Sequence, residues 1–193
     1  MEKSLGLKFG KRNLLITYHP VTNDREKDIG ALKNLLAALS ELEDTVLIFT
    51  KPNADVGHSE LANMLTHYVE KNENAFLYNS LGQPRYYSCL QFVDGVVGNS
   101  SSGLLEAPTF EIGTVNIGDR QKGRLLADSV VSCGPSFRGI QMALDKLVAP
   151  EFRRSLKGVS NPYGDGGAAQ GIMDVISKVD LSGLINKGFY DVA

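Results

Sequence analysis

Short apolar runs alternate with stretches of helical periodicity along most of this 193-residue chain, and this alternation limits the folds open to it. The run 13–18 is followed by Leu32, Leu35, Leu36 and Leu39, which have the i, i+3, i+4, i+7 spacing of a helix buried on one face. Strands that are covered on both faces are continuous apolar runs rather than alternating ones. The pattern therefore predicts buried strands joined by helices.

The same unit recurs along the chain. The further predicted strands are 45–50, 75–78, 95–98, 113–117 and 129–132. The further predicted helices are the segment 84–92 and those marked by the stripes Leu61/Met64/Leu65/Tyr68, Ile140/Ala143/Leu144/Leu147 and Ile172/Val175/Ile176. Repeated strand–helix units with right-handed crossovers form a parallel sheet with helices on both faces. The sequence thus predicts an α/β fold with a doubly wound parallel sheet.

Length and composition set the class of protein. A chain of 193 residues is long enough for one α/β domain and short for two, so we expect a single domain over 1–193. Apolar residues at 42% and charged residues at 22% are ordinary values for a globular protein and indicate neither a disordered chain nor a membrane-embedded one. The net charge of −2 gives no electrostatic footprint for nucleic acid, and residues 1–4 lack the apolar core of a signal peptide. We expect a cytoplasmic protein with neither a nucleic-acid nor a membrane partner.

The two cysteines, Cys89 and Cys133, both have apolar neighbours. Neither has a second cysteine or a histidine at the spacing of a zinc site. We therefore expect both to be small buried apolar side chains, and we expect no metal.

The segment 98–103, Gly-Asn-Ser-Ser-Ser-Gly, is called the serine turn below and comes where a predicted strand passes into a helix. Serine hydroxyls, a glycine that permits close approach and free N–H groups make an anion site at such a turn. Glu106, one helical turn later, is placed to accept hydrogen bonds from a sugar diol. Asn and Ser are also the preferred helix caps, and the spacing alone does not separate the two interpretations.

Several polar segments are expected at one edge of the predicted sheet. Ligands of doubly wound sheets bind beyond the carboxyl ends of the strands. This rule brings together His19, the loop 52–57, the segment 79–82 and the serine turn, although they are far apart in sequence. Their convergence predicts a ligand site at that edge.

Five ordered motifs carry a resemblance to a known family. They are Tyr18-His19-Pro20-Val21-Thr22, Pro52-Asn53-Ala54-Asp55-Val56-Gly57, the serine turn, Asn116-Ile117-Gly118-Asp119-Arg120-Gln121-Lys122-Gly123-Arg124 and Asn161-Pro162-Tyr163-Gly164-Asp165-Gly166. In this order and spacing the chain resembles the C-terminal half of a hydrolysing UDP-N-acetylglucosamine 2-epimerase. The continuation 20–22 favours the hydrolysing branch, because non-hydrolysing relatives usually have an Arg-rich continuation there.

The resemblance implies a Rossmann-like domain that forms the C-terminal half of a GT-B fold. The UDP-sugar is expected in the cleft between this domain and an N-terminal domain that is missing here. The implied reaction is anti elimination of UDP followed by addition of water, which yields N-acetylmannosamine for sialic acid synthesis. The acidic acid/base residues belong mainly to the missing half, so the chain alone is expected to bind UDP weakly and to be inactive. No nicotinamide, flavin or metal is implied, and the complete protein is expected to be a homo-oligomer.

The resemblance also implies roles for individual residues. Ser100 and Ser101 match the diphosphate-binding serines, Glu106 the ribose-binding glutamate and His19 the catalytic histidine, and Arg120 is expected to neutralise diphosphate charge. The remaining expected UDP contacts are Asn99 and Gly103, followed by the weaker candidates Ser102, Arg124, Asp55 and Asp165.

Alternative functions remain open at the level of the sequence. A related branch acts on UDP-N,N′-diacetylbacillosamine, and the segment 79–82 departs from relatives that have a histidine in this loop. A GT-B glycosyltransferase would have a similar nucleotide pocket, but the first motif and the serine turn together favour the epimerase. A free-standing nucleotide-binding module without enzymatic activity is the other alternative.

Overall fold

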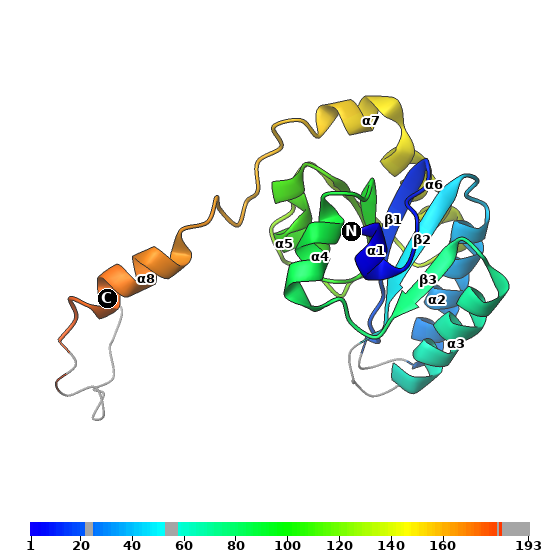
Figure 1. Cartoon of the computed structure of the whole chain (residues 1–193), viewed down its shortest axis with the longest axis horizontal. Helices are drawn as coiled ribbons and strands as arrows, with labels where there is room; N and C mark the ends of the chain where they lie inside the picture. The colour runs from blue at the N-terminus through cyan, green and yellow to red at the C-terminus, as the bar shows by residue number, and fades with distance from the viewer. Residues whose placement is uncertain (22–24, 53–57, 181, 183–193) are drawn as a thin grey trace. The chain divides into compact units, whose positions relative to one another are not determined.

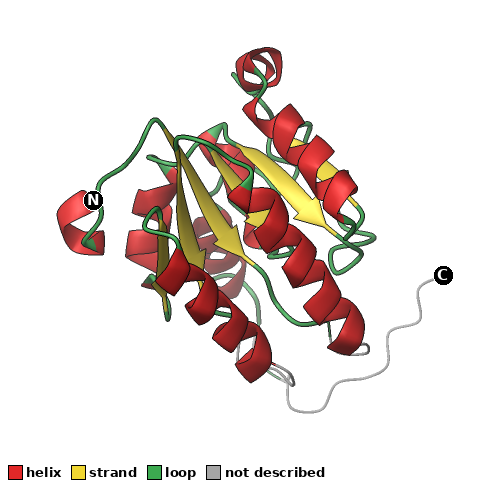
Figure 2. Cartoon of the chain, turned by 90° about the vertical axis from the view of Figure 1, so that its right-hand side faces the viewer, coloured by secondary structure: helices red, strands yellow, loops and turns green. Residues whose placement is uncertain are grey.

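A parallel sheet forms the centre of the computed structural model, which describes residues 1–21, 25–52, 58–180 and 182. Among these residues the strand order is β3-β2-β1-β4-β5-β6, with all neighbours parallel (Figure 2). The strands are β1 (Arg12–Thr17), β2 (Thr45–Thr50), β3 (Ala75–Tyr78), β4 (Gly95–Gly98), β5 (Gly113–Ile117) and β6 (Val130–Cys133). The order reverses between β1 and β4, which is where doubly wound sheets bind ligands.

The predicted α/β fold is confirmed, and four predicted strands have the observed bounds. Both β1 and β6 differ from prediction by one residue, in opposite directions along the chain. The longer helices are α2 (Arg25–Ser40), α3 (His58–Lys71), α4 (Gly82–Leu90) and α6 (Phe137–Val148) (Figure 1). Each contains its predicted apolar stripe or covers most of its predicted segment.

Alternate residues of each strand face opposite sides of the sheet, and helices cover both sides. In β1, Leu14 and Ile16 pack with the apolar faces of α2, α3 and α6, whereas Leu15 packs with the other side. That second cluster includes Leu90 of α4 and Leu5 of α1 (Glu2–Leu5). Burial on both faces explains why the strands are continuous apolar runs.

Several short elements have no counterpart in the predictions. They are α1, the 3-10 helix η1 (Ala107–Phe110) and α7 (Pro150–Ser155), while α5 (Ser102–Leu105) is the short helix expected after the serine turn. In α7, Pro150 occupies the first turn and Phe152 is buried, and Lys146 lies 5.6 Å from the ring centroid of Phe152. A single buried aromatic in six residues is too little for a periodic signal.

The chain divides into two units, Met1–Tyr163 and Gly164–Ala193. The sheet and its covering helices lie in the first unit. In the second, α8 (Ala168–Ile176) confirms the predicted helix, but its apolar stripe is exposed, with Val175 at 66%. The single domain over 1–193 therefore stays a prediction for this unit.

Both cysteines are free thiols, and Cys89 is buried while Cys133 is half-buried. Burial raises the pKa of each thiol to about 11. Among the described residues, His, Cys, Asp and Glu form no group of three that is able to hold a metal ion. None of the described helices has the length and apolarity that a membrane-crossing helix needs.

A candidate ligand site at the carboxyl edge of the sheet

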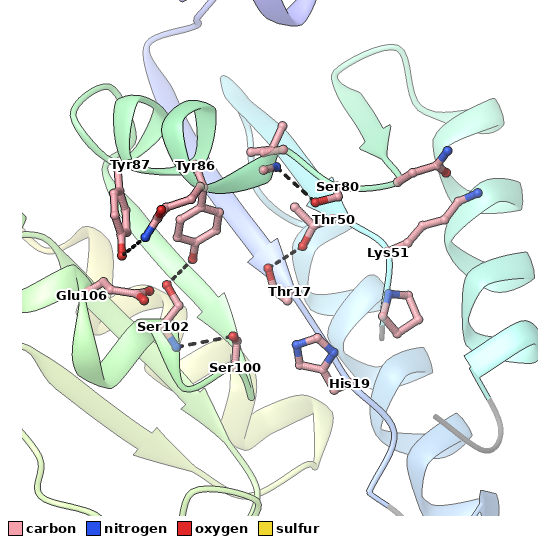
Figure 3. A pocket seen from close by; sticks show the side chains of 15 residues that line it. Thr17, His19, Thr50, Lys51, Ser80, Tyr86, Tyr87, Ser100, Ser102 and Glu106 are labelled. Carbon is pink, nitrogen blue, oxygen red and sulfur yellow. Dashed lines mark hydrogen bonds between the residues drawn. The ribbon is translucent and has the colours of Figure 1, made fainter. Parts of the chain in front are cut away.

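A cavity of about 500 Å³ lies at the carboxyl edge, beside the point where the strand order reverses. It is lined by the ends of β1 and β2, by the segment 79–83, by α4 and by the serine turn (Figure 3). His19, Pro52 and the segment 79–82 thus meet the serine turn as the sequence predicts. Residues 53–57, including Asp55, lie outside the described residues.

Two threonines in register lie side by side at the ends of neighbouring strands. Thr17 of β1 pairs with Thr50 of β2, and their hydroxyl oxygens are 2.6 Å apart (Figure 3). Both side chains are buried and both line the cavity. Sequence reasoning missed this pair. The available signal was a threonine at the end of each of two consecutive apolar strands.

The serine turn begins at a glycine whose backbone suits no other residue. Gly98 has φ 136°, and a Cβ there would lie 2.0 Å from the carbonyl oxygen of Thr17. After it, the Asn99 N–H donates to the Thr17 carbonyl over 3.2 Å. Within the described part of the chain, the backbone N–H groups of Ser100 and Ser101 have no hydrogen-bond partner. These N–H groups and the neighbouring hydroxyls are therefore available to an anion.

The three serines differ in position. Ser100 and Ser102 line the cavity, and the Ser102 N–H donates weakly to the Ser100 hydroxyl over 3.4 Å. The Ser102 hydroxyl also hydrogen-bonds to the Tyr86 hydroxyl (Figure 3). Ser101 is the residue before α5, is half-buried and is not part of the cavity lining.

Asn99 makes a pair of hydrogen bonds to the backbone of His19. Its Oδ1 accepts from the His19 N–H at 2.7 Å, and its Nδ2 donates to the His19 carbonyl at 2.8 Å. The Asn99 side chain is therefore bound to the protein itself and is not among the groups that line the cavity. The imidazole of His19 does line it (Figure 3).

Arg120 and Gln121 reach the same residue from the loop after β5. Gln121 Nε2 and Arg120 Nη1 donate to the Asn99 carbonyl, at 2.7 Å and 3.3 Å. Arg120 thus lies next to the serine turn, but it does not line the cavity. Arg124 is exposed and lines a second cavity of about 470 Å³ beyond β5 and β6.

Tyr86 and Tyr87 of α4 form an aromatic wall that sequence reasoning missed. Their ring centroids are 6.3 Å apart, with planes inclined by 66°. Burial raises the pKa of Tyr86 to about 12, an effect that the hydrogen bond with Ser102 partly opposes. Glu106 lines the cavity beside them (Figure 3). The available signal for this wall was a pair of adjacent tyrosines in a short predicted helix, just before the strand that leads into the serine turn.

Two other predicted residues have different surroundings. Gly103 is buried against β5, where a Cβ would lie 2.5 Å from Thr114 Cγ2, so close packing alone requires a glycine. Its carbonyl accepts from the Thr114 hydroxyl over 2.8 Å. Asp165 is exposed and lies in the second unit, which is described separately from the cavity.

Comparisons with known proteins identify a family for this chain. A family model described as UDP-N-acetylglucosamine 2-epimerase matches residues 2–177. A Campylobacter jejuni protein named GDP/UDP-N,N′-diacetylbacillosamine 2-epimerase (hydrolyzing) is 37% identical over 100% of this chain and 50% of its own length. An Escherichia coli polysialic acid biosynthesis protein is 30% identical over 99% of this chain and 50% of its own length.

A solved structure shares the fold. The UDP-N-acetylglucosamine 2-epimerase from Neisseria meningitidis, solved with UDP-N-acetylglucosamine bound, superposes with a TM-score of 0.69 at 16% identity. The match covers 92% of this chain and 47% of that one. The chain spans about half the length of the curated relatives that it matches.

Proposed function

Because the chain belongs to the UDP-N-acetylglucosamine 2-epimerase family, we propose that it is the nucleotide-binding half of a hydrolysing 2-epimerase. The proposed reaction converts UDP-N-acetylglucosamine and water into N-acetylmannosamine and UDP. A base removes the C2 proton while the bond from C1 to the UDP oxygen breaks, and water then adds across the resulting double bond. The observation that carries the proposal is the meeting of the serine turn, Glu106 and His19 at one cavity.

The diphosphate is proposed to bind at the serine turn. The backbone N–H groups of Ser100 and Ser101 are available within the described residues, and the hydroxyls of these serines add donors. The Arg120 guanidinium lies next to them at the Asn99 carbonyl. Hydrogen bonds from such groups to a charged phosphate are the strong kind, and they stabilise the negative charge that grows on the departing UDP.

The nucleoside is proposed to lie between Glu106 and the tyrosines. A carboxylate accepts two hydrogen bonds from a ribose diol, and Glu106 lines the cavity at one helical turn from the serine turn. Tyr86 and Tyr87 supply ring faces on which the uracil ring of UDP is proposed to stack. Stacking of a nucleobase on an aromatic side chain contributes about 1–3 kcal/mol. Asn99 and Gly103 support this site from behind rather than from the cavity wall.

His19 is proposed to be the catalytic residue that this half supplies. It follows β1 and lines the cavity close to Ser100 (Figure 3). The acid and base that act on C2 are proposed to come from the other half of the protein, so the chain alone is expected to bind UDP without releasing product. A cytoplasmic location, a role in sialic acid synthesis and a homo-oligomeric complete protein are parts of the same proposal.

A second substrate, UDP-N,N′-diacetylbacillosamine, is favoured by the printed name of the Campylobacter jejuni relative. The two sugars share the 2-acetamido group and the diphosphate, and they differ at C4 and C6. The groups proposed here contact the nucleotide and the diphosphate, which both substrates contain. The described residues therefore fit either UDP-sugar. Turnover of each UDP-sugar by the complete protein distinguishes the two substrates.

The test uses the complete protein with each UDP-sugar and no acceptor. We expect release of UDP together with the free 2-epimerised sugar from at least one substrate. His19→Ala is expected to lower turnover more than UDP affinity. UDP release that requires an added acceptor identifies a glycosyltransferase instead, and UDP binding without any turnover identifies a binding module.

A further inference from the structure

The backbone of His19 is held by a side chain that lies 80 residues away in sequence. Asn99 accepts from the His19 N–H at 2.7 Å and donates to the His19 carbonyl at 2.8 Å. Both residues are buried, with 1% of Asn99 and 7% of His19 exposed. Two short bonds in a buried setting fix both the position and the direction of this peptide segment.

This pair of bonds lies just beyond the end of regular strand pairing. The ladder between β1 and β4 ends where Thr17 pairs with Gly98. One more backbone bond follows, from the Asn99 N–H to the Thr17 carbonyl. The Asn99 side chain then carries the connection between the two strands on to His19. Asn99 therefore extends the rigid sheet to the residue whose side chain lines the cavity.

Asn99 is itself held from the far side. Gln121, which is 3% exposed, donates to the Asn99 carbonyl at 2.7 Å, and Arg120 donates to the same oxygen at 3.3 Å. A continuous series of hydrogen bonds therefore runs from the loop after β5, through Asn99, to His19. The residue expected to contact diphosphate and the residue expected to be catalytic lie at the two ends of this series.

We propose that Asn99 is a positioning residue that acts through His19, and that Gln121 supports it by holding its carbonyl. The inference rests on the proposed function in one respect, because it takes His19 as catalytic. The Asn99 side chain faces the protein and not the cavity, so its loss is expected to affect the chemical step more than nucleotide binding. A displacement of about 1 Å in a catalytic group lowers the rate by roughly 100-fold.

A matched control exists at the opposite end of β1. Asn13 Oδ1 accepts from the Gly10 N–H at 2.8 Å, and Asn13 Nδ2 donates to the Gly10 carbonyl at 3.3 Å. Asn13 is also buried, at 6% exposed. Its amide likewise accepts from one backbone N–H and donates to the carbonyl of the same residue, but the contact is local and lies at the amino edge. Asn13→Ala is therefore expected to lower stability without changing kcat.

The experiment compares Asn99→Ala, Asn99→Asp, Gln121→Ala and Asn13→Ala in the complete protein. For each variant, kcat, the Kd for UDP and hydrogen exchange at the His19 amide are measured. We expect about a 10- to 100-fold loss of kcat for Asn99→Ala, with the Kd for UDP changed less than about threefold. Asn99→Asp keeps the acceptor and loses the donor, so its kcat is expected to lie between those of wild type and Asn99→Ala. Gln121→Ala should have a smaller effect in the same direction.

Two failures remain distinguishable. If the wild-type protein turns over neither UDP-sugar, the proposed function fails, and loss of exchange protection at the His19 amide in Asn99→Ala but not in Asn99→Asp still supports the positioning contact. If the wild type is active and the folded Asn99 variants keep kcat within about twofold, the inference is overturned. Should Asn99→Ala not fold, Asn99→Asp and Gln121→Ala decide the question by the same measurements. Equal losses of kcat in Asn13→Ala and in Asn99→Asp also overturn the inference.

Discussion

At the amino edge of the sheet polar groups bind one another, whereas at the carboxyl edge two backbone N–H groups of the serine turn have no partner among the described residues. Asp94, just before β4, accepts from the Asn13 N–H at 2.8 Å and pairs with Arg153. Lys11 pairs with Asp44 at 3.4 Å. At the other edge, the Ser100 and Ser101 N–H groups have no partner within the described residues.

The difference follows from how parallel sheets are connected. Every strand of such a sheet ends at the same edge, and the loops that follow have to turn back over it. Gly98 makes one of these turns tight enough for the next residues to expose backbone N–H groups. The polar groups named at the amino edge are thus paired within the protein, whereas the carboxyl edge keeps N–H groups available to a ligand. The predictions below test this division, in order of decreasing expected effect.

The largest effect is expected from an alanine at the carboxyl end of β4. In Gly98→Ala the new Cβ would clash with the Thr17 carbonyl at a positive φ, and we expect a loss of about 3–5 kcal/mol of folding free energy. Gly95→Ala, at the other end of the same strand, meets the movable Leu147 side chain at 2.8 Å and should cost about 1–3 kcal/mol. Urea denaturation measures both. Equal losses of folding free energy in the two variants would contradict the expected difference between the two ends of β4.

Loss of a serine hydroxyl should weaken nucleotide binding. In Ser100→Ala or Ser101→Ala one hydrogen bond to a charged phosphate is lost, which is about 1.5–3 kcal/mol or roughly a 10- to 100-fold rise in the Kd for UDP. Calorimetric titration with UDP measures the change. Ser155, whose hydroxyl donates to the Phe152 carbonyl in α7, supplies the control: Ser155→Ala should leave the Kd unchanged. An unchanged Kd in both serine-turn variants counts against the proposed site.

An amino-edge substitution should affect stability alone. Arg153→Ala removes the partner of Asp94, whose side chain is 17% exposed, and we expect a loss of about 1 kcal/mol. Lys11→Ala breaks a pair that is almost fully exposed and should cost less than about 0.5 kcal/mol. Thermal unfolding and the Kd for UDP are measured together. A change in UDP affinity in either variant would break the separation between the edges.

A smaller effect is expected from pH, through Tyr86. Burial raises the pKa of Tyr86 from 10.0 to about 12, so the folded protein holds this proton more tightly than the unfolded chain does. The resulting stability is complete below pH 10 and is lost as the pH rises toward 12. At pH 10.5 the loss is less than about 1 kcal/mol. The free energy of unfolding is measured at pH 8 and 10.5. It should fall less between these pH values in Tyr86→Phe than in the wild type, and equal decreases would exclude Tyr86 as a source of the pH dependence.

The sheet could be predicted because its signal is local. The segments 45–50 and 95–98 are short and have continuous apolar centres, Val46–Phe49 and Val96–Val97, as expected of strands that are covered on both faces. The helix α7 could not be predicted, because six residues with one buried aromatic, Phe152, have no periodicity. For α8 the periodicity predicts the helix but does not say whether its apolar stripe is covered.

The site could be predicted only as far as topology determines it. His19 and the serine turn meet because parallel strands end at one edge, which is a rule that sequence order is enough to apply. The adjacent tyrosines Tyr86 and Tyr87 are visible in the sequence, but their place in the cavity wall depends on how α4 is rotated against the sheet, which the sequence pattern alone does not determine. The contact between Asn99 and His19 depends on β1 and β4 being neighbours across 80 residues, which only the strand order reveals.

The most direct test of the site is an NMR titration of this chain with UDP, with uridine as the control. The account predicts that UDP shifts the amide signals of Ser100, Ser101 and Glu106, and that uridine shifts the Ser100 and Ser101 signals far less because it has no phosphate. The signals of Gly10, Asn13 and Asp94 at the amino edge should not move. Binding that leaves the serine turn unchanged, or that shifts the amino edge instead, would contradict the account.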